Sequence, residues 1–228
     1  MNQEAMFPEA VAAVSNLGGP LFCVETSIQD WQTIAQELRQ KGARLLGIWG
    51  ESSGDLGFLI HALFLQKNNC LWCRLRLPET AVEFPSLSAI FPTASRQERA
   101  IADLLGLRAS GNTDRRPWLR HAAWPASFFP LRQGPIPQAD LGVQGDTDYA
   151  YVTFSDKNSH EIPVGPVHAG TIEPGHFRFT CVGEQVLHLE ERLGYTHKGV
   201  ERLFHGLDPV RGLTLAGRIS GDSTVAYA

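Results

Sequence analysis

The chain has 228 residues, of which 43% are hydrophobic and 19% are charged, so it can bury a core and is neither disordered nor fibrous. Its 20 basic and 24 acidic residues give a net charge of −4, which excludes the basic character typical of nucleic-acid-binding proteins. The longest apolar stretch, 56–65, is about half as long as a membrane-spanning helix. Residues 1–19 contain no Lys or Arg and therefore lack the positive region of a secretory signal. We expect a cytoplasmic protein that associates with a membrane only through partners.

The cysteines are too few for a disulfide framework in a chain of this length, which favours a reducing compartment. Cys70 and Cys73 have the CxxC spacing of a metal site or a redox dithiol. On a strand, however, positions i and i+3 point to opposite faces, and no second CxxC completes a tetrahedral site. Buried structural thiols are therefore the favoured interpretation.

The first half of the chain predicts a domain of mixed α and β structure. Thr26 or Ser27 can cap a helix that ends near Gln40, because apolar residues recur between them at helical spacing. Three apolar runs then predict antiparallel strands with one hairpin: 44–49, 57–66 and 70–77.

A second helix is predicted from Ser95, where Glu98 completes a capping-box pattern, to Gly106 as the stop. The segment 125–145 is rich in Pro and Gly and poor in periodic apolar residues, which is typical of an extended connector. We expect the domain boundary there.

Beyond the connector, the sequence predicts a β-hairpin and two helices. Apolar and polar residues alternate over 177–181, a turn follows at Gly183, and 186–189 forms the return strand. One helix is predicted over 197–204, and another begins at Asp208 with Pro at its first helical position. The latter is rich in small residues and has no capping signal at its end, so we expect another backbone to approach it closely.

Two groups of titratable residues are candidates for chemistry. His197, Glu201 and His205 are spaced four apart, so a helix would align them on one face, where such a row can pass protons. A solvated helix face is the alternative. His168 and His176 lie in a loop rich in Pro and Gly, and such loops present polar groups to a cavity or a partner. An ordinary surface turn is the alternative there.

Several stretches resemble known families. The runs GPVHAGTIEPGHFRF, LGYTHKGVERLF and LAGRISGDSTVAYA are similar to the opening of the large subunit of energy-converting NiFe hydrogenases of the formate hydrogenlyase type. They are also similar to the related D subunit of respiratory complex I. The runs PSLSAIFPTASRQERAIADLLGL and DRRPWLRHAAWP resemble the C subunit of complex I. These two modules are fused in this order in formate hydrogenlyase-type proteins, and the resemblance extends from about Thr26 onward.

The resemblance implies an α+β fold in four segments. After an N-terminal segment, 1–25, we expect an α/β sandwich domain like the C subunit of complex I over 26–132 and a linker over 133–155. Over 156–228 we expect a β-hairpin and helices that begin a hydrogenase large-subunit fold, equivalent to the N-terminal part of the D subunit.

The resemblance also implies that the chain holds no metal. In the hydrogenases, cysteines of an Arg-x-Cys-Gly-x-Cys motif hold the nickel–iron centre, but Ser220 and Ser223 replace both cysteines here. A neutral Ser is a poor ligand for a soft metal. The D subunit of complex I lines a quinone cavity with the vacated region, so a quinone is a candidate ligand, and His168 and His176 are candidates for lining a quinone or partner cavity. The quinone-contacting His of the D subunit precedes the hairpin Gly, whereas the order here is Pro-Gly-His, so its role is not carried over.

The proton-transfer glutamate of the hydrogenases lies in an Arg-Gly-x-Glu motif, which Lys198 to Glu201 match with Lys in place of Arg. The resemblance therefore implies that Glu201 transfers protons, with His197 and His205 beside it. A carboxylate enclosed by packed helices loses hydration, so we expect the pKa of Glu201 to be raised. Glu190, which precedes this segment, is expected to face solvent.

Taken together, these features imply a peripheral subunit of a membrane-associated oxidoreductase of the NADH:quinone or formate hydrogenlyase type, on the cytoplasmic side of the membrane. The chain would contribute to electron and proton transfer, dock the iron–sulfur small subunit, and not be catalytic alone. It would bind no cofactor directly other than the candidate quinone. Iron–sulfur clusters and any NAD would lie in partner subunits, and other subunits would provide the membrane arm. The alternatives are a structural or assembly subunit without redox chemistry, or part of an active NiFe hydrogenase.

Overall fold

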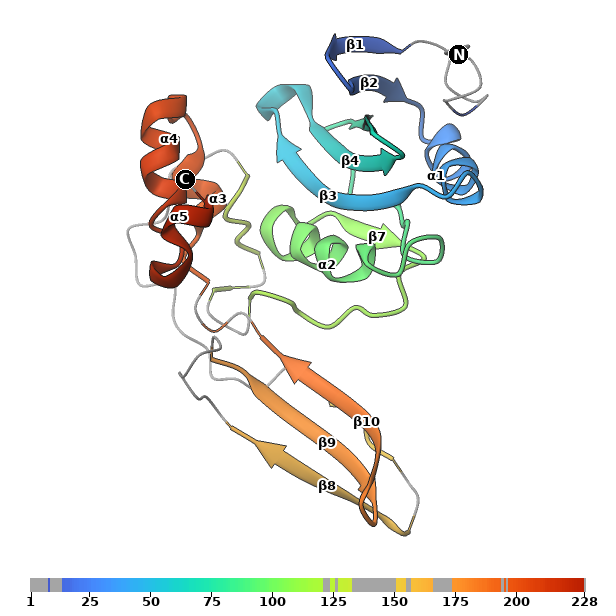
Figure 1. Ribbon diagram of the computed structural model, residues 1–228, viewed down its shortest axis with the longest axis vertical. Helices are drawn as coiled ribbons and strands as arrows, with labels where there is room; N and C mark the ends of the chain where they lie inside the picture. Colours follow the sequence, from blue (N-terminus) through green and yellow to red (C-terminus); the bar gives the residue numbers. More distant parts are fainter. Residues whose placement is uncertain are drawn as a thin grey trace. The chain divides into compact units, whose positions relative to one another are not determined.

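The chain divides into two compact units, Met1–Lys157 and Asn158–Ala228, each of which is described by itself (Figure 1). The computed structural model describes residues 8, 14–120, 124–125, 127–132, 151–154, 157–165, 174–193, 195 and 197–227. Most of the predicted linker, 133–155, lies outside these residues, so its boundaries stay a prediction. The fold is of mixed α and β structure, and the sheets dominate it.

The first unit is built on a five-stranded sheet with the strand order β1-β2-β5-β4-β3. The parallel pairing of β2 with β5 is the exception, since the other neighbours are antiparallel. The strands are β1 (Ser15–Gly18), β2 (Leu21–Thr26), β3 (Arg44–Ser52), β4 (Phe58–Gln66) and β5 (Asn69–Leu77). The three predicted strands and their hairpin are thus confirmed, whereas β1 and β2 were not predicted. A short 3-10 turn, η2 (Gly54–Leu56), joins β3 to β4.

Two helices, α1 (Asp30–Gln40) and α2 (Ala94–Leu105), share one hydrophobic core with the sheet (Figure 1). Helix α1 begins later than expected, but Ser27 does serve its start, because its Oγ accepts a hydrogen bond from the Asp30 N–H at 3.1 Å. Trp31 is fully buried, and its indole N–H donates to the Pro85 carbonyl at 3.0 Å. Each large buried side chain of this kind contributes about 1.5–3 kcal/mol to folding. The other buried residues of α1 are Ile34, Ala35 and Leu38.

The start of α2 differs from the predicted capping box. The N-cap is Thr93, Ser95 lies inside the helix, and Glu98 is buried and bonds to groups outside the helix. The predicted stop is confirmed, because Gly106 is left-handed with φ of 72°. Short strands on either side of the helix, β6 (Glu83–Pro85) and β7 (Arg108–Ser110), form a parallel pair.

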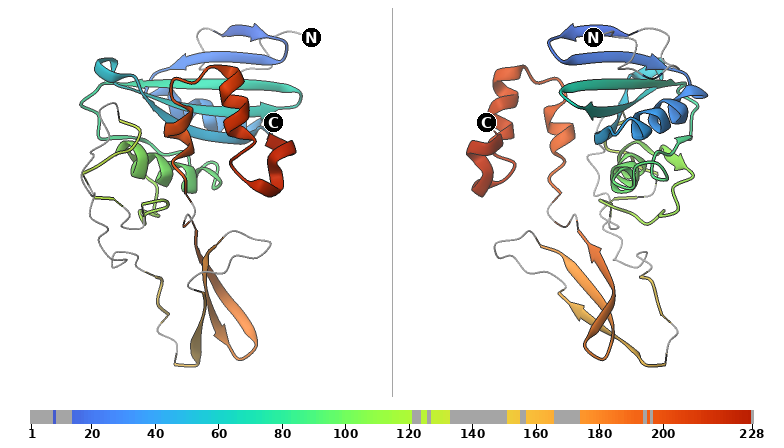
Figure 2. Two further views of the ribbon diagram at one scale, coloured as in Figure 1. Left: turned by 90° about the vertical axis from the view of Figure 1, so that its left-hand side faces the viewer. Right: turned by 45° about the vertical axis from the view of Figure 1, so that its right-hand side comes forward.

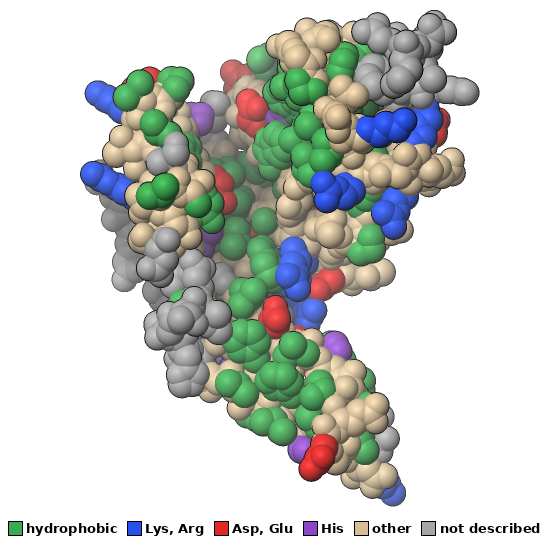
Figure 3. Space-filling model, in the orientation of Figure 1, with side chains coloured by type: hydrophobic (Ala, Val, Ile, Leu, Met, Phe, Trp, Pro, Cys, Tyr) green, Lys and Arg blue, Asp and Glu red, His purple; other side chains and the backbone are tan. Residues whose placement is uncertain are grey.

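The second unit contains a three-stranded antiparallel sheet whose strands lie side by side in the order β10-β9-β8 (Figure 2). The hairpin of β9 (His176–Val182) and β10 (Gln185–Arg192) was predicted, and β8 (Ser159–Val164) extends it. Hydrophobic side chains gather over this sheet (Figure 3), and those that are exposed are Ile162, Val164, Val186, Leu187 and Leu189.

Short helices complete the second unit: α3 (Val200–Phe204), α4 (Pro209–Ala216), η3 (Gly221–Ser223) and α5 (Thr224–Tyr227). Helix α3 starts three residues later than predicted, because Gly199 is left-handed with φ of 64°. Helix α4 begins as predicted, since the Asp208 carboxylate accepts from the N–H groups of Val210 and Arg211. Helix α4 ends at Ala216, so the small residues Gly217, Ser220 and Gly221 lie outside it. No helix in the described part of the chain is long and apolar enough to cross a bilayer.

Candidate functional site

The best candidate for proton chemistry is the pair formed by His197 and Glu201 in the second unit. The Nε2 of His197 lies 3.2 Å from Oε2 of Glu201. An ionised carboxylate can only accept, so the imidazole N–H is the donor in this contact. This hydrogen bond lowers the pKa of Glu201 below its ordinary value, although partial burial opposes the shift. Glu201 is therefore ionised at neutral pH.

Two expectations for this segment are wrong. The pKa of Glu201 is lowered rather than raised, because its side chain is 48% exposed and accepts the hydrogen bond from His197. The three titratable residues also do not share one helix. His197 precedes the left-handed Gly199, and His205 follows α3 with an extended ψ of 122°. The pair of His197 and Glu201 forms across the start of the helix instead.

The same segment contacts the region that carries nickel ligands in the hydrogenases. The Lys198 ammonium donates to the carbonyl oxygen of Ile219 at 2.7 Å. Ile219 directly precedes Ser220, and the Ser223 N–H donates to the Ser220 carbonyl at 3.3 Å. A hydrogen bond thus joins Lys198 to the backbone next to Ser220. Within the residues that the structure describes, no three or more His, Cys, Asp or Glu side chains are grouped to hold a metal ion.

The other predicted site residues are His168 and His176. His168 lies outside the described residues, and His176 is a half-buried residue at the start of β9. Their roles in a quinone or partner cavity stay predictions. Glu190 is buried, with its carboxylate 3.9 Å from Nε2 of His188, so the expectation that it faces solvent is wrong.

The CxxC cysteines lie on β5, as expected for structural thiols. Cys73 is fully buried in the core of the first unit, and burial raises the pKa of its thiol well above the ordinary value. A thiol that stays protonated is neither a metal ligand nor a nucleophile. Cys70 is only half buried, and the two residues are on opposite faces of the strand.

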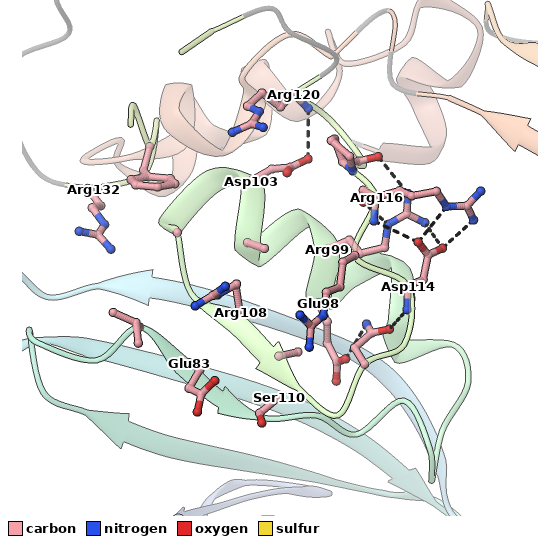
Figure 4. A pocket seen from close by; sticks show the side chains of 18 residues that line it. Glu83, Glu98, Arg99, Asp103, Arg108, Ser110, Asp114, Arg116, Arg120 and Arg132 are labelled. Atoms are coloured by element: carbon pink, nitrogen blue, oxygen red, sulfur yellow. Dashed lines mark hydrogen bonds and ion pairs between the residues drawn. The ribbon is translucent and has the colours of Figure 1, made fainter. Parts of the chain in front are cut away.

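A polar pocket in the first unit was not predicted. It has a volume of about 650 Å³ and lies beside α2, which directs Glu98, Arg99 and Asp103 toward it (Figure 4). Glu98 lies at its buried end, where the carboxylate accepts hydrogen bonds from Ser86 Oγ at 2.7 Å, the Leu87 N–H at 2.6 Å and the Asn112 amide at 2.9 Å. Burial raises the pKa of Glu98.

Arg99 and Asp103 hold an irregular segment, 112–120, against α2. The Arg99 guanidinium donates to the carbonyls of Arg116 and Pro117, at 2.6 Å and 2.9 Å, and to the Asp114 carboxylate at 2.9 Å. Asp103 Oδ2 accepts from three successive backbone N–H groups, those of residues 118–120, at 2.6–3.1 Å. Burial alone would raise the pKa of Asp114, but hydrogen bonds and charges from the two arginines lower it. These contacts fix the segment without regular secondary structure.

The first unit contains the part of the chain that matches a known family. The family model of the respiratory-chain NADH dehydrogenase, 30 Kd subunit, matches residues 24–137, which is half of the chain. This range includes α1, α2, the pocket beside α2 and strands β3, β4 and β5 of the five-stranded sheet, whereas β1 and half of β2 precede it.

Curated relatives match a larger part of the chain. Formate hydrogenlyase subunit 5 of Escherichia coli is 32% identical over 153 residues, which cover 63% of this chain and 26% of the relative. Hydrogenase-4 component G of the same organism is 37% identical over 124 residues, with coverage of 53% and 22%. The C/D subunit of the NADH-quinone oxidoreductase of Phocaeicola vulgatus is 28% identical over 188 residues, with coverage of 75% and 36%.

The matched part of this chain therefore spans between 22% and 36% of the length of these relatives. The relatives are subunits of the formate hydrogenlyase, hydrogenase-4 and NADH-quinone oxidoreductase systems, so the resemblance predicted from the sequence is confirmed. Because the family model covers half of the residues, and the sheet and helices that it covers form one continuous core, the chain belongs to the family of the respiratory-chain NADH dehydrogenase 30 Kd subunit.

Proposed function

We propose that this chain is a peripheral subunit of a membrane-associated redox complex of the complex I or hydrogenase type. The observation that supports it most is the extent of the similarity to the C/D subunit of the NADH-quinone oxidoreductase. The matched 75% of the chain exceeds the share made up by the first unit, so the similarity continues into the second. The chain would dock the iron–sulfur small subunit on the cytoplasmic side, while iron–sulfur clusters and any NAD lie in partner subunits.

Within this proposal, the pair of His197 and Glu201 relays protons. An imidazole can take up a proton on one ring nitrogen and release one from the other, so His197 is the proton carrier. The ionised Glu201 accepts the imidazole N–H at 3.2 Å and thereby fixes the orientation of the ring. His205 extends the relay beyond α3, and His168 and His176 line a quinone or partner cavity.

One observation favours the alternative of a structural subunit without redox chemistry. The Glu201 side chain is 48% exposed, and a carboxylate with a lowered pKa is not a proton donor near neutral pH. A helix-start pair of this kind would then only stabilise α3. The two functions differ in whether the complex loses turnover when the pair is removed.

We expect the complex purified through this chain to contain no nickel bound by it. Ser220 and Ser223 offer neutral hydroxyls where a soft metal needs thiolates, and a 2.7 Å hydrogen bond from Lys198 holds the adjacent backbone. Elemental analysis together with quinone extraction tests the proposal. Bound quinone or redox turnover without nickel supports the proposal. If the complex shows neither quinone nor turnover, the structural alternative is supported. About one nickel per chain would contradict the expectation and identify a hydrogenase subunit.

A further inference from the structure

The pocket beside α2 is unusually basic for a chain with a net charge of −4. Its arginines come from α2, β7, the segment 112–120 and the residues beyond it (Figure 4). The full set is Arg99, Arg108, Arg115, Arg116, Arg120 and Arg132. The acidic residues of the lining are Glu83, Glu98, Asp103 and Asp114.

Three of the four acids are already used inside the protein. Asp114 forms ion pairs with Arg99 and Arg116, at 2.9 Å and 2.8 Å. Asp103 is occupied by backbone N–H groups, and Glu98 is buried with a raised pKa. The fourth acid of the lining is Glu83, an exposed residue of β6.

Four of the arginines are left without a carboxylate. Arg108, Arg115 and Arg120 form no ion pair with any described residue. Arg132 donates to the Leu105 carbonyl at 2.8 Å, and its guanidinium stacks over Phe129 at 4.8 Å. Counted against all four carboxylates, the six arginines leave the lining with an excess of about two positive charges.

The backbone that carries three of these arginines is held in place in advance. Arg120 lies in the segment that Asp103 binds through its backbone N–H groups, and Arg115 lies between Asp114 and Arg116, which bond to each other and to Arg99. Arg108 starts β7, whose register with β6 is fixed by the parallel pairing. A backbone that is already fixed loses less conformational entropy when a ligand binds. The hydrogen-bond network of α2 therefore favours ligand binding by these arginines.

We propose that this pocket binds a small polyanion that carries two or more phosphate or carboxylate groups. The planar guanidinium of Arg matches both groups in bidentate fashion. The volume of about 650 Å³ lies within the range of small-molecule sites. The source of the anionic groups is either a free metabolite or an acidic segment of a partner subunit. This binding site is independent of the proposed proton relay.

Titration calorimetry on the full chain, at low and at physiological salt, tests the site. The probes are pyrophosphate and citrate for a free ligand, and a hexaglutamate peptide for a partner segment. We expect saturable 1:1 binding of at least one probe, weakened by salt. In the double variant R108Q/R120Q the affinity should fall roughly tenfold or more, because each charged hydrogen-bonding group contributes on that scale.

Two controls test whether a loss of affinity in the double variant is specific to the pocket. Neither replaced side chain bonds to a described residue, so the double variant should keep the thermal unfolding midpoint of the wild-type chain. R44Q, which removes an exposed arginine of β3 outside the pocket, should bind as the wild type does. Tight binding of pyrophosphate or citrate identifies a metabolite site, and binding of the peptide alone identifies a partner segment. The proposal is overturned if no probe binds saturably or if the folded double variant binds as well as the wild type.

Discussion

Replacing Glu98 with alanine should lower the free energy of unfolding of the first unit by about 3 kcal/mol or more. The side chain is 1% exposed and accepts hydrogen bonds from Ser86, Leu87 and Asn112. Its removal leaves a cavity and strands these donors in the core, where each unpaired group costs about 1–3 kcal/mol. Urea denaturation followed by tryptophan fluorescence measures the change, since Trp31 lies in the same core.

Two further variants show whether the cause is the hydrogen-bond network. Glu98→Gln keeps the shape, and its amide oxygen can still accept from Leu87, so about 1 kcal/mol should be lost. Glu79→Ala removes an exposed glutamate and should change the free energy of unfolding by less than about 0.5 kcal/mol. A loss below about 1 kcal/mol in Glu98→Ala would show that the hydrogen bonds of Glu98 do not stabilise the first unit.

Replacing His197 or Glu201 with glutamine should lower turnover of the assembled complex by roughly a hundredfold, the scale of a lost acid–base group. Each substitution removes a titrating group but keeps a polar side chain that can still form a hydrogen bond at this exposed or half-buried position, so assembly should be spared. Because the two residues act as one unit, the double variant should be no slower than the worse single variant. Steady-state turnover at a constant amount of assembled complex measures the effect.

The sign of the pKa shift adds a second readout. The ordinary pKa of a glutamate is 4.5, and the pKa of Glu201 is lower. Glu201 is therefore ionised at any pH above 4.5 and loses its charge only as the pH falls below that value. Glu201→Gln should therefore change the rate without changing the shape of the pH profile between about pH 5 and 8. Glu184, exposed in the β9–β10 turn, is a suitable control, whereas the buried Glu190 is not. Turnover of Glu201→Gln at the wild-type rate would favour the structural alternative.

Strands β3, β4, β5, β9 and β10 and the ends of several helices could be predicted from local sequence because local physics determines them. The apolar runs of β3, β4 and β5 are long enough to be buried on one face, and Gly106 supplies the left-handed residue that ends α2. The spacing of four also predicted the contact between His197 and Glu201. The contact does not arise within one helix, however, because His197 precedes the left-handed Gly199 and α3 begins after it.

Features that depend on tertiary partners could not be found in the same way. Glu98 lies where a capping box would place it, but Ser86 and Asn112 lie next to it only after the chain folds. Arg99 and Asp103 of α2 likewise bind a segment 15–18 residues away in sequence, which no local pattern predicts. The exposure of Glu201 likewise depends on which chain segments surround α3.

The polypeptides that assemble with this chain test its proposed role most directly. Membranes would be solubilised in a mild detergent, the complex purified through a tag on this chain, and its composition determined by native mass spectrometry with an iron assay. We predict a complex that contains this chain, at least one iron–sulfur subunit and membrane subunits. If the chain is instead recovered as a monomer or a homo-oligomer without iron, it is not a subunit of a redox complex.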